Sequence, residues 1–179
     1  MHEIETKVLE VDTKSLIKNL EALGAKKIQE VMLTVDWFSA PGFDKDHQPW
    51  FLRVRSYSTG KIEVTWKGKH EIEGSARKVR EVNVLVDNHE NTKTLFEAIG
   101  LVCYAHQEKR RISWKLESVQ FDLDTYPKMP AYLEIEAPSE KEISEMIKKL
   151  NLSEHQTWND GEKTLIEGKY KINWCDMRF

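Results

Sequence analysis

Charged side chains recur at every second position in six separate segments of this 179-residue chain. Successive side chains of a β-strand point to opposite faces, so this spacing predicts six strands that each have one charged face and one apolar face. The charged positions are Glu3, Glu5 and Lys7; Arg53 and Arg55; Lys61, Glu63 and Lys67; Lys109 and Arg111; Asp122 and Asp124; and Glu134 and Glu136. The charged face of such a sheet either meets water or surrounds something polar.

Helix signals are fewer than strand signals. An apolar 3–4 spacing ends at Gly24, a second short helix pattern ends at Gly100, and Ser139 with Glu142 forms a capping box that opens a third helix. The predicted strands lie at residues 3–11, 26–39, 50–57, 61–67, 77–86, 102–115, 118–124 and 131–137, with a loop at 68–75 and a partly helical tail from residue 154. Few of these elements alternate as βαβ units, so we expect an α+β fold with a mostly antiparallel sheet.

Composition excludes several classes of protein. The 27 Lys and Arg residues nearly cancel the 30 Asp and Glu residues, so the charge balance predicts no affinity for nucleic acid or membranes. The amino terminus has no apolar signal-peptide core, and no apolar run approaches the roughly 18 residues of a spanning helix. Cys103 and Cys175 show no metal-ligand spacing. We expect one cytoplasmic domain over residues 1–179.

The grouping of the charges suggests what the sheet does with them. Carboxylates gather on the first strand and the last two, whereas cations gather on the middle strands. A closed eight-stranded antiparallel β-barrel would collect both sets in one charged lumen, and the apolar faces would then lie outside under the helices. From the residues alone an alternative stays open, in which the charges cancel as structural ion pairs or the sheet faces water.

Clustered carboxylates beside clustered cations suit one type of ligand. Hard cations such as Mg²⁺ and Mn²⁺ select carboxylate oxygens, and phosphate oxygens select Arg and Lys. A metal-bound polyphosphate satisfies both sets together.

The same residues resemble the motifs of the CYTH superfamily, the triphosphate tunnel metalloenzymes. The opening Glu3, Glu5 and Lys7 resembles the family's ExExK motif. The match continues in order through Leu52–Arg55 (LRxR), Thr65 and Lys67 (TxK), Glu81, Lys109, Arg111 and Trp114 (KxRxx-aromatic), and Asp124, Glu134 and Glu136 (D…ExE). The resemblance implies the tunnel fold and a metal-dependent reaction on a triphosphate.

The resemblance also implies roles for individual residues. The implied metal ligands are Glu3, Glu5, Asp124, Glu134 and Glu136, and the implied phosphate-binding residues are Lys7, Arg53, Arg55, Lys67, Lys109 and Arg111. Within these sets, Glu5, Lys7 and Lys67 are the candidate catalytic residues. Asp122 shares the inward parity and is an additional candidate acid. Asn83 stands where many members have a second glutamate, so the number of bound Mg²⁺ or Mn²⁺ ions stays open.

Three functions follow from these expectations. The leading hypothesis is a metal-dependent hydrolase of a small-molecule triphosphate: tripolyphosphate, thiamine triphosphate or a nucleoside triphosphate. The second is a class IV adenylyl cyclase that converts ATP to cyclic AMP and pyrophosphate, although no adenine-reading pattern stands out. The third is a non-catalytic protein that binds polyphosphate or a nucleotide. The six histidines share no ligand spacing and are expected to be surface or structural residues, and a homodimer is left open.

Overall fold

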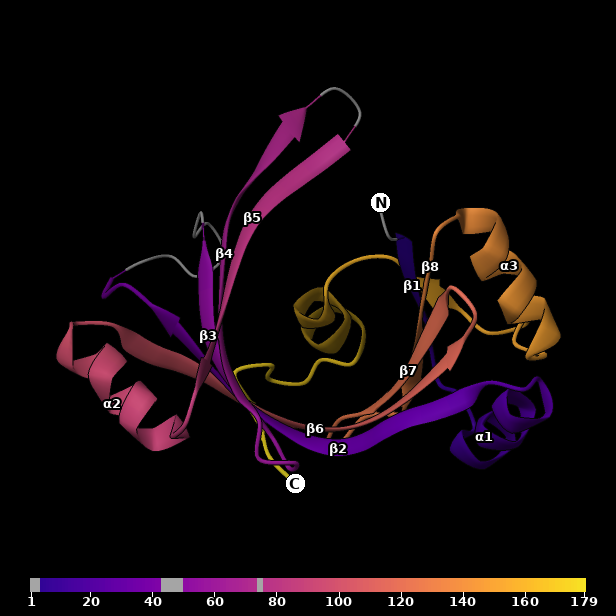
Figure 1. The fold of residues 1–179 in the computed structure, drawn as a ribbon, viewed down its shortest axis with the longest axis horizontal. Coiled ribbons are helices and arrows are strands. Elements are labelled where there is room, and N and C mark those ends of the chain that lie inside the picture. Colours follow the sequence, from indigo (N-terminus) through magenta and orange to yellow (C-terminus); the bar gives the residue numbers. More distant parts are fainter. Residues whose placement is uncertain (1–3, 43–49, 74–75) are drawn as a thin grey trace. The chain divides into compact units, whose positions relative to one another are not determined.

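The computed structural model describes residues 4–42, 50–73 and 76–179, and within them it contains an α+β fold built on one mostly antiparallel sheet (Figure 1). The elements in chain order are β1 Ile4–Val8, α1 Thr13–Ala22, β2 Lys26–Ser39, β3 Phe51–Tyr57, β4 Ile62–Glu73, β5 Ala76–Val86, α2 His89–Ala98, β6 Val102–Leu116, β7 Val119–Thr125, β8 Tyr132–Ala137, α3 Glu140–Lys149, β9 Thr157–Trp158, the π-helix η1 Thr164–Lys169 and β10 Asp176–Met177. The fold class agrees with the sequence prediction.

The expected closed eight-stranded barrel is wrong for the described residues. The sheet has ten strands in the order β5-β4-β3-β2-β6-β7-β8-β1-β9, with β10 paired to β6, so its order has two ends. One edge of β1 pairs with β8, and the other edge pairs with β9 at Lys7 and Val8. Because β9 pairs with this second edge of β1, the edge does not pair with β5 at the other end of the sheet. This topology therefore does not form the enclosed lumen that we expected.

The described chain divides into two compact units. The first unit comprises residues 1–32, 109–173 and 179, and the second comprises residues 33–108 and 174–178. Strands β2 and β6 contribute residues to both units. Each unit is described by itself below.

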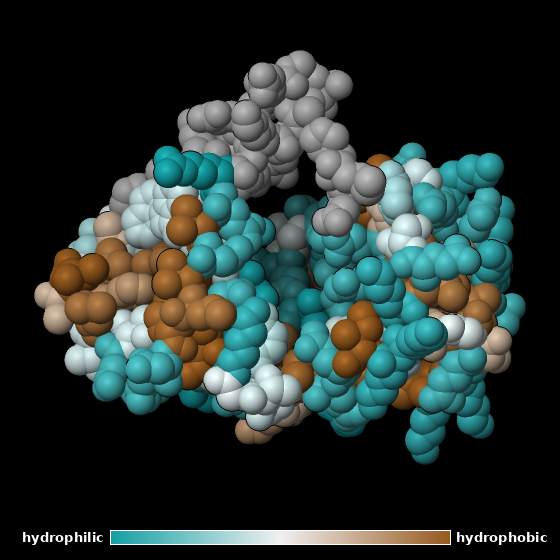
Figure 2. All heavy atoms as spheres, in the orientation of Figure 1, coloured by the Kyte–Doolittle hydropathy of each residue, from teal (hydrophilic) through white to brown (hydrophobic). Residues whose placement is uncertain are grey.

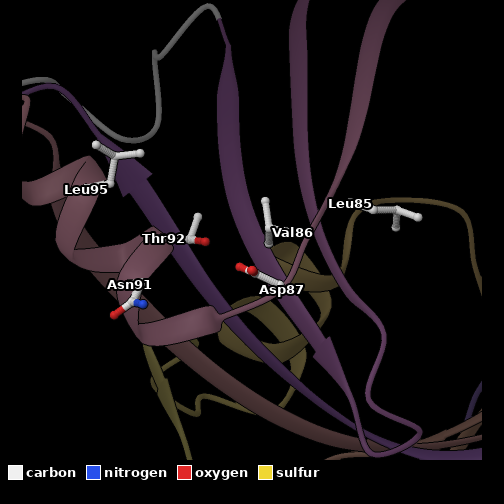
Figure 3. A pocket seen from close by; sticks show the side chains of 6 residues that line it. All are labelled: Leu85, Val86, Asp87, Asn91, Thr92 and Leu95. Carbon is white, nitrogen blue, oxygen red and sulfur yellow. The ribbon is translucent and has the colours of Figure 1, made fainter.

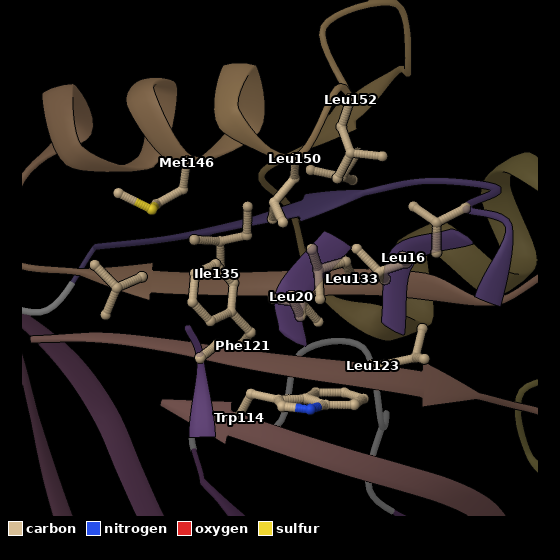
Figure 4. Close-up of a cluster of buried hydrophobic side chains, with 14 of the residues drawn as sticks. Leu16, Leu20, Trp114, Phe121, Leu123, Leu133, Ile135, Met146, Leu150 and Leu152 are labelled. Carbon is tan, nitrogen blue, oxygen red and sulfur yellow. The ribbon is translucent and has the colours of Figure 1, made fainter. Parts of the chain in front are cut away.

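The core of the first unit lies between its strands and its two α-helices. Leu16 and Leu20 of α1 and Met146 of α3 lie in the same buried cluster as Phe121 and Ile135 (Figure 4). The strand residues come from the apolar parity of β6, β7 and β8, so the charged parity of these strands lies on the face away from the helices. The predicted apolar face therefore does pack under helices.

Helix caps in this unit follow the sequence signals. The side chain of Asp12 accepts a hydrogen bond from the backbone N–H of Ser15 at 2.8 Å and begins α1. Ser139 Oγ accepts from the Glu142 backbone N–H at 3.3 Å, which is the N-cap half of the predicted capping box, and it donates to Glu142 Oε2 at 2.7 Å. None of the helices in the described ranges is long and apolar enough to cross a membrane.

The second unit has a smaller core and a more exposed apolar surface. Phe38 and Val54 are buried, and the Phe38 ring meets that of Phe96 of α2 edge-on at 5.2 Å between centroids. Among the described residues of this unit, four large apolar side chains are more than half exposed: Val84 and Leu85 of β5, Leu95 of α2 and Ile99, which follows α2. Hydrophobic residues also gather over the α2 region in the space-filling view (Figure 2).

The loop expected at residues 68–75 is wrong over most of its length, because β4 continues to Glu73 and β5 begins at Ala76. Residues 74 and 75 lie outside the described residues. The pairing of β4 with β5 shifts register between Lys67 and His70. At Gly68 an added Cβ would lie 2.8 Å from the Trp66 ring, so this glycine marks a close approach within a strand.

Candidate functional site

The first unit places Arg111 and Asp124 directly opposite each other on β6 and β7. Arg111 donates from Nε to Asp124 Oδ1 at 2.7 Å and from Nη2 to Asp124 Oδ2 at 2.6 Å. Asp124 is fully buried. Burial alone raises the pKa of this carboxyl, but Lys109 and Arg111 outweigh it and hold the pKa below its ordinary value. The Asp124 carboxyl is therefore ionised, and each of its two oxygens accepts a hydrogen bond from Arg111.

Lys109, two residues earlier on β6, joins the same carboxylate to a second one. Its Nζ lies 2.9 Å from Asp124 Oδ2 and 2.6 Å from Glu162 Oε1. Two phenols complete this contact set: Tyr126 donates to Glu162 Oε2 at 2.5 Å, and Tyr132 donates to Glu162 Oε1 at 3.0 Å. Three donors therefore converge on one carboxylate.

Glu162 is the residue of this cluster that sequence reasoning missed. It lies between β9 and η1, in a segment without strand parity, so alternation gives no signal for it. Burial raises the pKa of its carboxyl, but Lys109 outweighs that effect and the pKa is strongly lowered. Burial, followed by the charge of Glu162, raises the pKa values of the Tyr126 and Tyr132 phenols well above the ordinary value, so both phenols stay protonated donors.

Lys7 joins β1 to β8. Its Nζ lies 3.2 Å from Glu5 Oε1 and 3.2 Å from Glu134 Oε2, and Lys7 is only 3% exposed. Burial lowers the pKa of this ammonium, but Glu134 and Glu5 together raise it above its ordinary value. The pKa of the Glu134 carboxyl is raised, because the effect of burial outweighs the positive charges of Arg111 and Lys7, which lower it.

Asp122 belongs to this cluster, as its parity predicts. Arg111 Nη1 lies 2.9 Å from Asp122 Oδ2, and Ser113 Oγ donates to Asp122 Oδ1 at 2.5 Å. Arg111 Nη2 also lies 3.6 Å from Glu134 Oε1. The guanidinium of Arg111 thus contacts carboxylates of both β7 and β8.

Two carboxylates face each other across β1 and β8, and Lys7 Nζ lies 3.2 Å from one of them, Glu5 Oε1. Glu5 of β1 pairs with Glu136 of β8, and Glu136 also pairs with Gln120 of β7. Like charges directly opposite each other in an antiparallel pair are unfavourable unless a cation lies nearby. Glu3, the remaining implied metal ligand, lies outside the described residues.

The donor set of the first unit has the chemistry of a site for a hard divalent cation. Carboxyl groups outnumber cations in the contact cluster: Glu5, Asp122, Asp124, Glu134 and Glu162 against Lys7, Lys109 and Arg111. Carboxylate oxygen is the ligand that Mg²⁺ and Mn²⁺ select, and an added cation offsets the surplus. Among the described residues, no three His, Cys, Asp or Glu side chains converge as a metal-binding group. The carboxylates therefore match such an ion in donor type, whereas several of their oxygens contact Lys or Arg instead.

The second unit places the other implied phosphate-binding residues against aromatic rings. The guanidinium of Arg53 lies 5.4 Å from the centroid of the Trp37 ring and 5.7 Å from that of Phe51. Arg55 donates to the Tyr57 hydroxyl at 3.2 Å. Such contacts between a guanidinium and an aromatic ring orient the cation.

Lys67 has one carboxylate partner in this unit. Its Nζ lies 2.8 Å from Glu81 Oε2, and Asn83 donates to Glu81 Oε1 at 2.8 Å. Burial raises the pKa of Glu81, but the bonds from Lys67 and Asn83 lower it overall. The amide of Asn83, found where the resemblance leads one to expect a second glutamate, thus acts as a hydrogen-bond donor.

The second unit also contains a buried carboxylate that sequence reasoning missed, as it missed Glu162 in the first unit. Asp36 of β2 is 2% exposed and contacts His89 Nε2 at 2.9 Å and His106 Nδ1 at 2.7 Å. The other ring nitrogen of His89 lies 2.6 Å from Ser56 Oγ. Asp36 thereby links α2 to β2, β3 and β6, and both histidines have the structural role expected of them.

A surface pocket lies between the end of β5 and α2 (Figure 3). It is lined by Leu85, Val86, Asp87, Asn91, Thr92 and Leu95. Asp87 is its single titratable lining residue, and none of the implied site residues lines it. This pocket does not have the chemistry of a phosphate site.

Comparison with known proteins identifies the family. A protein of Methanocaldococcus jannaschii, provisionally named an adenylate cyclase, is 27% identical over 164 residues, which are 86% of this chain and 91% of the relative. The structure of PH1012 from Pyrococcus horikoshii matches with a TM-score of 0.67 and 27% identity, covering 87% of this chain and 94% of the other.

A Hippeastrum protein, provisionally named adenylyl cyclase HpAC1 and described with a dominant triphosphatase activity, has the same fold. It matches with a TM-score of 0.61 and 12% identity, over 96% of each chain. The CYTH domain profile matches residues 1–167. Since that match spans most of the sequence, the chain belongs to the CYTH domain family.

Proposed function

We propose that this protein is a divalent-metal-dependent hydrolase of a triphosphate, with tripolyphosphate, thiamine triphosphate or a nucleoside triphosphate as its substrate. One observation supports this most: within a member of the CYTH family, Lys7, Lys109 and Arg111 lie mostly buried among more carboxyl groups than they can neutralise. A purely structural ion-pair network has no need of the surplus negative charge. A divalent cation and an anionic substrate complete the balance together.

The proposed ligands of Mg²⁺ or Mn²⁺ are Glu3, Glu5, Asp124, Glu134 and Glu136. When bound, such an ion lowers the pKa of an attacking water and offsets charge on the phosphate oxygens. Divalent-metal dependence is the general expectation for this family, and the choice between the two ions is part of the proposal.

The cations of the chain supply the rest of the proposed mechanism. Lys7, Lys109 and Arg111 bind phosphate oxygens, and the same role is proposed for Arg53, Arg55 and Lys67. Burial removes competing water, so an ammonium such as Lys109 attracts a phosphate oxygen more strongly than it would in bulk solvent. The raised pKa of Lys7 keeps it protonated at neutral pH, so its proposed catalytic role is charge stabilisation and not proton uptake. Glu5 and Lys67 are the other proposed catalytic residues.

Purified protein incubated with Mn²⁺ and either tripolyphosphate or ATP tests the proposal. We expect metal-dependent release of orthophosphate. Cyclic AMP and pyrophosphate formed from ATP would instead support a class IV adenylyl cyclase, the alternative favoured by the provisional name of the M. jannaschii relative. Tight binding without turnover would leave a non-catalytic polyphosphate-binding protein. A single domain over residues 1–179 and a homodimer stay predictions.

Glu5→Gln tests the proposed metal site directly. Its carboxylate is exposed and opposes Glu136, so we expect loss of metal-dependent phosphate release with an unchanged circular dichroism spectrum. Glu21→Gln, an exposed change of the same charge on α1, serves as the control and should retain turnover. Retained turnover in Glu5→Gln would remove Glu5 from the site.

A further inference from the structure

The carboxylate of Glu162 accepts hydrogen bonds from three side chains of the charged cluster. Lys109 Nζ, Tyr126 Oη and Tyr132 Oη all contact its oxygens, at 2.6, 2.5 and 3.0 Å. An ammonium and two phenols donate hydrogen bonds and carry no negative charge, so together they form a seat for an anionic oxygen. This seat lies within the first unit.

The attachment of the tail brings Glu162 to this seat. Four residues upstream, Trp158 of β9 pairs with Lys7 of β1, and Thr6 Oγ1 donates to Asn159 Oδ1 at 2.5 Å. On the downstream side, Leu165 and Ile166 of η1 are fully buried. The short segment around Glu162 is thus anchored at both ends, which keeps a carboxylate beside Lys109 when no substrate is bound.

Displacement of Glu162 would move a side chain that already reaches the surface, because it is 24% exposed, whereas that of Lys109 is only 8% exposed. Lys109 keeps Asp124 as a partner after such a departure, so no isolated buried cation is left. The Tyr126 hydroxyl then has a free donor for a phosphate oxygen, and the Tyr132 hydroxyl, which also lies 3.1 Å from Asp124 Oδ2, can donate to either acceptor.

We propose that Glu162 is an internal competitor that occupies the anion seat of Lys109, Tyr126 and Tyr132 and that a phosphate group of the substrate displaces it. The inference rests on the proposed function, because it takes the bound anion to be a triphosphate. Glu162 thereby sets substrate affinity. It also raises selectivity for highly charged polyphosphates, since a weakly charged anion gains too little from Lys109 to displace the carboxylate.

The test is binding of sodium tripolyphosphate to the full chain in EDTA, measured by isothermal titration calorimetry. We expect Glu162→Gln, which keeps the shape and removes the charge, to bind about tenfold more tightly than the wild type. Glu154→Gln is the matched control, because it removes one exposed carboxylate from the same tail, and its affinity should stay within about twofold.

Affinity that is unchanged or weaker in Glu162→Gln would overturn the inference, since a weaker complex means that Glu162 positions Lys109 for binding. Glu162→Asp, with a carboxylate too short to reach all three donors, should also bind more tightly than the wild type, and this second variant decides the matter if Glu162→Gln does not fold. Absence of tripolyphosphate binding in every variant in EDTA overturns this inference, whereas the proposed function is overturned only by absence of metal-dependent phosphate release in the Mn²⁺ assay. Binding by the wild type without a gain in Glu162→Gln or Glu162→Asp overturns the inference alone.

Discussion

The two units treat their cations differently. In the first unit, Lys109 and Arg111 each contact two or more carboxylates, and the central one, Asp124, is fully buried. In the second unit, Arg53 and Arg55 lie against aromatic rings, and the carboxylate partner of Lys67 is about one-third exposed. Alternation at strand spacing therefore fixes which face a charged side chain occupies, but the neighbouring strand and the tail decide what that side chain contacts.

The difference predicts that charge removal damages the first unit more than the second. Arg111→Met leaves Asp124 and Asp122 without their guanidinium, so we expect the free energy of unfolding in urea to fall by about 3–5 kcal/mol. Arg55→Met should cost much less, because its contact is a phenol hydroxyl.

Arg110→Met controls for position on β6. Its guanidinium pairs with Glu30 at the surface, where an ion pair contributes at most about 1 kcal/mol. Equal losses for Arg111→Met and Arg55→Met would break the comparison between the units.

Asp36 differs from the other charged residues of the second unit because it is buried between two histidines, and its removal is expected to give the next largest loss of stability. Burial alone raises its pKa, but hydrogen bonds from His89 and His106 outweigh burial and hold the pKa at about 2. A carboxyl whose pKa is lower in the folded state than in the unfolded state stabilises the fold above the unfolded value. That stabilisation, roughly 2 kcal/mol, is lost as the pH falls from about 4 to about 2.

Asp36→Asn should therefore lower stability by roughly 2 kcal/mol at pH 7 and make the dependence of stability on pH shallower between pH 4 and pH 2. Urea unfolding at a series of pH values measures both quantities. If the stability of Asp36→Asn changed with pH between 4 and 2 as steeply as that of the wild type, His89 and His106 would not be lowering the pKa of Asp36 as expected.

The smallest effect on stability is expected at Lys67. Both Lys67 and its partner Glu81 are about one-third exposed, so Lys67→Gln should change the free energy of unfolding by less than about 1 kcal/mol. Its effect on ligand binding is expected to be larger, with affinity for tripolyphosphate reduced about tenfold. Lys18→Gln, an exposed change of the same charge on α1, should alter neither quantity. A loss of stability in Lys67→Gln without a loss of tripolyphosphate affinity would contradict this prediction, because Lys67 would then stabilise the fold and not bind the ligand.

Sequence parity predicted a substantial part of the candidate site. It placed Lys109, Arg111, Asp122 and Asp124 on the same face of neighbouring strands, and the register brings Arg111 directly opposite Asp124. The pattern could not supply Glu162, which lies on no strand, or Asp36, whose partners come from α2 and β6. Contacts made by loops and helices depend on the tertiary fold and leave no periodic signal.

Two errors of the sequence prediction have local causes. The composition of residues 68–75 is typical of a loop, yet paired backbone hydrogen bonds extend β4 and β5 through most of that segment, with Gly68 allowing the Trp66 ring to lie close to the backbone. Barrel closure was inferred from the grouping of the charges and from the resemblance to the tunnel fold. The two-residue strand β9, too short to carry a sequence signal, pairs with the edge of β1 instead.

The partners of β1 also have a consequence for the order in which the chain can assemble on the ribosome. Strand β1 is synthesised first, but it pairs with β8 and β9, whereas β3, β4 and β5 pair with strands that precede or follow them directly. The meander of β2 to β5 can therefore assemble while translation continues. Strand β1 waits for more than a hundred further residues, and its ladder depends on contacts of long sequence separation, which form slowly.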